Sequence, residues 1–266
     1  MFGQLTLWNM DRSGRELSLV CVFTLLFSGI SRLLLASSNH ILNGIAIFTC
    51  IFSVVLMAAC IILPVLLAWL DFRRYVYLDE SYQVHSLPIS NTGIVNAQVV
   101  SALVWCLIAV FCVVASIWLL LPASLMSQVE DIISVFTEQS SHGTLLFFLW
   151  FSGQLFLQTI LYVFCGFIGL QAGYAKPDRQ LGRTFLVGIL TYFIAGLSMI
   201  GILFLVMFLQ EGGLDFLNSD TLDPSLVLPV FRLCFLLALT IDLILYGICL
   251  YQSKKGLNLI LSLIHI

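Results

Sequence analysis

Charged side chains are scarce in this chain of 266 residues. Asp, Glu, Lys and Arg make up 9% of the sequence, whereas 61% of the residues are hydrophobic and the mean hydropathy is +1.08. A water-soluble domain of this composition has too little polar surface to cover its apolar side chains. The composition excludes a soluble globular protein and predicts an all-α membrane protein.

The sequence also lacks the motifs of catalysis, nucleotide binding and metal binding. It has no G-x-x-x-x-G-K-[ST] phosphate loop, no H-E-x-x-H and no G-x-S-x-G. The four histidines are dispersed, and the eight cysteines all fall within apolar runs, where they count as small apolar residues rather than a disulfide framework. We therefore expect no enzymatic activity, no metal and no cofactor on this chain.

Six apolar runs are long enough to cross a bilayer, which takes about 20 helical residues. They predict one transmembrane domain over residues 1–266. The predicted spans are 17–36, 41–70, 99–121, 145–170, 184–209 and 230–250.

Basic residues are missing from three of the five connections between these spans. Nine of the eleven fall on one side of the predicted membrane, which the positive-inside rule makes cytoplasmic together with both termini. The other two, Arg32 and Arg232, lie within spans near the opposite face. The nine are Arg12, Arg15, Arg73, Arg74, Lys176, Arg179, Arg183, Lys254 and Lys255.

The connections on the outer side carry acidic residues instead. Residues 124–138 have apolar side chains at helical spacing and predict an amphipathic helix on the outer surface. The acidic residues of the outer loops either form a vestibule that attracts cationic solutes or only keep these loops soluble outside the membrane.

The cytoplasmic connection 71–98 is the richest in functional residues. Residues 71–82 mix charges with aromatic rings, which suits a helix at the membrane interface with its rings at headgroup level. Pro88 then breaks the helix and holds Leu87 extended, and Ser90 caps the next helix. The pattern predicts a helix–break–helix elbow, and the alternative is a plain turn between two spans.

The run DESYQVHSLPISNTGIVNAQVVSALVW, which starts at Asp79, resembles the hallmark of permease subunits of bacterial ABC exporters of the type-2 superfamily. Those permeases carry an acidic, aromatic stretch, then Leu-Pro-(Val/Ile)-Ser, then the third span. KKGLNL at 254–259 is similar to the Lys-Lys-Leu-Asn-Leu tail that follows their sixth span. Gln98 departs from the pattern, because lysine often stands there.

This resemblance implies that the elbow is a coupling element that docks on a separate ATPase, which would hold the ATP and magnesium. It further implies a second permease half, identical or related, and a bacterial plasma-membrane location. The cargo would be an amphipathic or cationic peptide or a hydrophobic drug. The residues implied in coupling are Asp79, Glu80, Tyr82, Leu87, Pro88 and Ser90.

Polar residues inside the spans suggest a translocation path or a dimer seam. Gln154, Gln158 and Tyr162 are spaced to share one helix face, and hydrogen bonding between helices is the alternative role. Asp242 is costly to place in lipid, at about 2.5–3.5 kcal/mol. It either pairs with Arg32 or lines the path. Two other function classes stay open, a non-transporting scaffold or sensor subunit and an ion-coupled secondary transporter.

Overall fold

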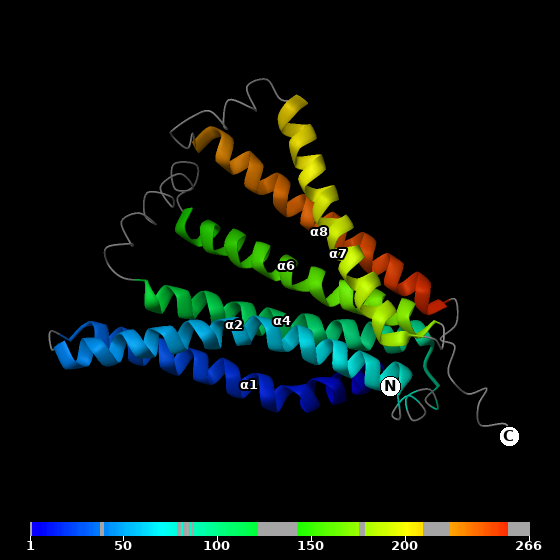
Figure 1. Cartoon of the computed structure of the whole chain (residues 1–266), viewed down its shortest axis with the longest axis horizontal. Coiled ribbons are helices and arrows are strands. Elements are labelled where there is room, and N and C mark those ends of the chain that lie inside the picture. Colours follow the sequence, from blue (N-terminus) through cyan, green and yellow to red (C-terminus); the bar gives the residue numbers. More distant parts are fainter. Residues whose placement is uncertain are drawn as a thin grey trace. The chain divides into compact units, whose positions relative to one another are not determined.

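The computed structural model describes residues 2–37, 40–78, 81, 84, 86, 88–121, 143–175, 179–209 and 224–254. Within these ranges six helices are long and apolar enough to cross a membrane, so the protein is a multi-pass membrane protein. Figure 1 labels them. They are α1 (Phe2–Leu35), α2 (His40–Tyr77), α4 (Asn91–Leu120), α6 (Gly143–Tyr174), α7 (Gln180–Leu209) and α8 (Pro224–Lys254).

The helices form two units of three. Unit 1 holds α1, α2 and α4, which all pack against one another. Contacts such as Ser31 with Ser53 and Ser13 with Asp71 make α1 and α2 antiparallel. Arg32 meets the end of α4, whereas Gly14 meets Trp105 further back, so α1 and α4 are parallel.

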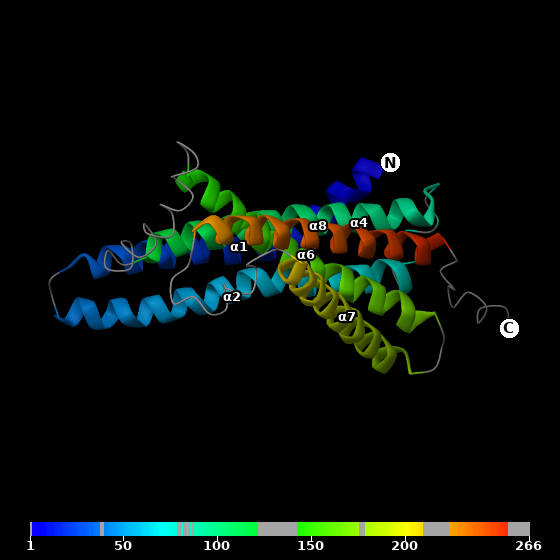
Figure 2. The same cartoon turned by 90° about the horizontal axis from the view of Figure 1, so that it is seen from above.

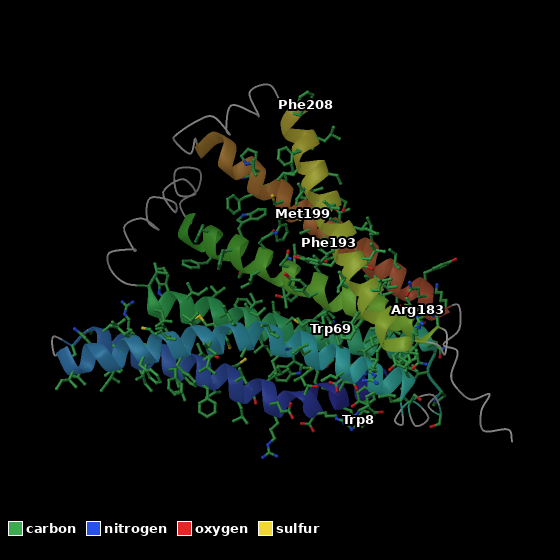
Figure 3. All side chains as sticks on the ribbon, viewed as in Figure 1. Trp8, Trp69, Arg183, Phe193, Met199 and Phe208 are labelled. Carbon is green, nitrogen blue, oxygen red and sulfur yellow. The ribbon has the colours of Figure 1, made fainter. Side chains whose placement is uncertain are left out.

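Unit 2 holds α6, α7 and α8, with α6 at its centre. The ring of Trp150 meets that of Phe235, and Gln171 bonds to Cys249, so α6 and α8 run parallel. Figures 1 and 2 show α7 beside α6 where the two helices are joined and splayed from it at its far end. Most of the apolar side chains of α7 are exposed, as lipid-facing residues of a span are; Figure 3 labels Phe193 and Phe208 among them.

A two-glycine motif explains the close approach of α6 and α7. A Cβ at Gly169 would lie 2.6 Å from the carbonyl oxygen of Thr184 and 3.1 Å from the Cα of Gly188. A Cβ at Gly173 would overlap the side chain of Thr184. The G-x-x-x-G spacing in the sequence predicts such a contact, and it is confirmed.

All six predicted spans are confirmed as helices, but the helices are longer than the apolar runs. The 38 residues of α2 reach roughly 57 Å at 1.5 Å per residue, against a hydrocarbon core of about 30 Å. Residues 71–77 therefore continue the second span and are not a separate interfacial helix. The predicted outer helix 124–138 lies outside the described residues.

The described cations gather at one end of each unit. Arg12 and Arg15 near the start of α1 neighbour Arg73 and Arg74 at the end of α2. In unit 2 the start of α7 carries Arg183, and the end of α8 carries Lys254. Two cations lie at the opposite ends, Arg32 at the end of α1 in unit 1 and Arg232 near the start of α8 in unit 2.

Candidate functional site

Three described residues of the connection between α2 and α4 are exposed. They are Ser86, Pro88 and Ser90, whereas Val84 is buried. Ser90 is the N-cap of α4, because its hydroxyl accepts a hydrogen bond from the backbone N–H of Gly93 at 3.2 Å. The predicted cap is thus confirmed. Asp79, Glu80, Tyr82 and Leu87 lie outside the described residues.

A polar and aromatic cluster ties α1 to the end of α2 just before this connection. We call Trp8, Arg12, Ser13, Asp71 and Tyr75 the anchor cluster. Ser13 donates a hydrogen bond to the Asp71 carboxylate at 2.5 Å, and Arg12 donates to the Tyr75 hydroxyl at 3.0 Å. The Arg12 guanidinium also lies 5.6 Å from the centre of the Tyr75 ring, and the Trp8 ring lies 5.2 Å from it.

The aromatic rings at the end of α2 do not lie at headgroup level as the sequence predicts. Phe72 and Tyr75 are fully buried within the protein, because α1 extends alongside this part of α2. Figure 3 labels Trp8 on the opening turns of α1. The contacts of the anchor cluster could not be predicted from the sequence, because they join residues of α1 and α2 that are more than 50 positions apart.

The third helix of unit 1 packs closely at the same end. A Cβ at Gly14 of α1 would lie 2.8 Å from the Trp105 ring of α4. Asn9 is buried with its amide atoms unpaired among the described residues, and so is the Trp105 indole nitrogen. Gln98 is buried as well. The end of unit 1 that leads into the elbow is therefore a packed, polar-lined bundle.

The predicted polar stripe of α6 is engaged in part within unit 2. Gln158 donates a hydrogen bond to the Tyr162 hydroxyl at 3.4 Å, one turn further along α6. The Tyr162 ring stacks on Tyr192 of α7, with centroids 5.4 Å apart and planes at 26°. Gln154, Gln158 and Tyr162 are all half-buried. The stripe contributes to the α6–α7 contact and keeps a partly accessible polar edge.

Asp242 of α8 is 5% exposed, and neither of its carboxylate oxygens has a hydrogen-bond partner among the described residues. Arg32 is engaged elsewhere, since it donates to the carbonyl oxygens of Leu119 and Leu121 at 3.3 and 3.2 Å. A guanidinium at these final carbonyls complements the dipole of α4. Both roles expected for Asp242, pairing with Arg32 and lining a path, stay predictions.

Among the described residues, no group of three or more His, Cys, Asp or Glu side chains is arranged to hold a metal ion. Comparison with family models, curated proteins and solved structures returns no match to this chain. The case for a function therefore rests on the residues and their geometry.

Proposed function

We propose that this chain is the membrane-spanning half of an ATP-driven exporter, which forms the pathway with a second permease half and is powered by separate ATPase subunits. The observation that carries the proposal is the elbow. The helix α2 extends to Tyr77, Pro88 is exposed in the connection that follows, and α4 begins directly after the Ser90 cap. Such an element suits docking on another protein better than a plain turn does.

The anchor cluster suits a part that transmits force. A push on the elbow acts on the end of α2, where Asp71 and Tyr75 are held by Ser13 and Arg12 of α1. A hydrogen bond that involves a charged group is worth about 1.5–3 kcal/mol, so the two helices resist separation at this end. Movement at the elbow would thus displace α1 and α2 together instead of bending α2 alone.

The charge distribution supports a cytoplasmic elbow. Arg73 and Arg74 end α2 beside Arg12 and Arg15 of α1, and the positive-inside rule assigns such an end to the cytoplasm, where ATP is available. Within unit 2 the half-buried Gln158–Tyr162 edge offers polar atoms to a cargo. An amphipathic or cationic peptide or a hydrophobic drug fits these groups.

The test compares two proline variants of the full chain, purified in mild detergent from cells that express it natively. The variant Leu87→Ala with Pro88→Ala alters the elbow. The control Pro229→Ala alters an exposed proline in α8. We expect an ATP-hydrolysing partner at equal stoichiometry with the wild type and the control, and its loss with the elbow variant.

Reconstituted vesicles extend the test to transport. ATP-dependent movement of a fluorescent amphipathic cation should occur with the wild type and the control and disappear with the elbow variant. A chain that purifies without any nucleotide-hydrolysing partner would refute the proposal. Transport unchanged in the elbow variant, at equal expression, would show that the elbow does not couple the two proteins.

A further inference from the structure

Thiols from all three helices of unit 1 come together in its apolar interior. The sulfur of Cys21 in α1 lies 3.5 Å from that of Cys60 in α2, although the residues are 39 positions apart. Cys112 of α4 approaches Cys21 as well and is half-buried. Cys21 is 7% exposed and Cys60 is 2% exposed, so water-soluble reagents are kept from both.

The hydrogen bonds of these thiols orient the two sulfurs toward each other. Cys60 donates its S–H to the carbonyl oxygen of Ala109 at 3.9 Å. Its sulfur is then free to accept the S–H of Cys21, which is the remaining donor of the pair. A disulfide needs a separation of about 2.05 Å, so the sulfurs have roughly 1.5 Å to close.

A proline in α2 removes one backbone hydrogen bond beside the cysteine pair. Pro64 lies inside α2, four residues after Cys60, and it has no N–H to donate to the Cys60 carbonyl. The helical hydrogen-bond ladder is therefore interrupted in the turn that carries Cys60. This turn therefore has one helical hydrogen bond fewer to resist the small adjustment that brings the sulfurs together.

We propose that Cys21 and Cys60 are a site of oxidation, at which a membrane-dissolved quinone converts the two thiols into a disulfide. Two S–H bonds break and one S–S bond forms, and the two electrons and two protons pass to the quinone oxygens to give the quinol. Reactants and products are all uncharged, which suits a site within the hydrocarbon region. The disulfide would join α1 to α2 at mid-span.

The test uses the full-length protein in lipid nanodiscs, treated with a short-chain ubiquinone analogue. After denaturation, alkylation counts the free thiols, and peptide mass spectrometry locates the linkage. We expect the count to fall from eight to six. A Cys21–Cys60 linked peptide, lighter by two hydrogen atoms, should appear and should revert with dithiothreitol.

Two variants and a second oxidant make the result specific. The linkage should persist in Cys106→Ala, a buried cysteine of α4, and be absent from Cys60→Ala. Molecular iodine, which is small and enters lipid, serves as the second oxidant. Linkage with iodine but not with the quinone would overturn the quinone as oxidant. No linkage in the wild type with either reagent would overturn the site itself, whether or not the variants fold.

Discussion

Replacing Gly169 with alanine should weaken the α6–α7 contact, whereas the same change at Gly196 should not. The added Cβ at 169 would lie 2.6 Å from the Thr184 carbonyl oxygen. Unstrained contacts begin near 3.5 Å, so the helices must separate by roughly 1 Å. Overpacking of this kind costs about 1–3 kcal/mol. At Gly196 of α7 a Cβ would meet nothing within 4 Å.

Both variants share the gain in helix propensity from glycine to alanine, about 0.8–1.0 kcal/mol. This term cancels in their difference, so Gly169→Ala should be less stable than Gly196→Ala by about 1–3 kcal/mol. Unfolding in mixed micelles of rising SDS fraction, followed by circular dichroism, measures the two free energies. Equal stability of the two variants, or a more stable Gly169→Ala, would refute the close contact between α6 and α7.

Two further substitutions probe single polar groups. Tyr75→Phe keeps the buried ring but removes the hydroxyl that accepts from Arg12, so the same unfolding assay should show a loss of about 1–3 kcal/mol; an unchanged free energy would mean that this bond contributes nothing. Asp242→Leu removes a buried carboxylate without a hydrogen-bond partner among the described residues and should stabilise the chain by about 1–3 kcal/mol. A less stable Asp242→Leu would instead reveal a partner of the carboxylate, such as a group on another chain.

The spans could be predicted from the sequence because they depend on a local property. A run of apolar residues must be helical in lipid, and its length alone decides whether it crosses. The Ser90 cap and the Gly169–Gly173 spacing are local for the same reason, since each acts within one or two helical turns. The start of α1 and the end of α2 could not be predicted in this way, because both helices continue into polar sequence, where hydropathy does not indicate whether the chain is helical.

The polar contacts of the two units could not be predicted, because they join residues far apart in the chain. Arg32 illustrates this. Its charge within a span indicates a need for compensation, which a carboxylate or several carbonyl oxygens can supply. The structure satisfies Arg32 with the carbonyls of Leu119 and Leu121, groups that every residue possesses and no sequence pattern distinguishes.

The pairing of Cys21 with Cys60 likewise depends on residues that are far apart in the chain. As single residues they are indistinguishable from the other six cysteines, and each counts as a small apolar side chain. Their chemistry arises only where antiparallel packing of α1 and α2 brings one sulfur against the other and Pro64 loosens the adjoining turn. Helix pairing therefore decides which of eight chemically equivalent thiols can react together.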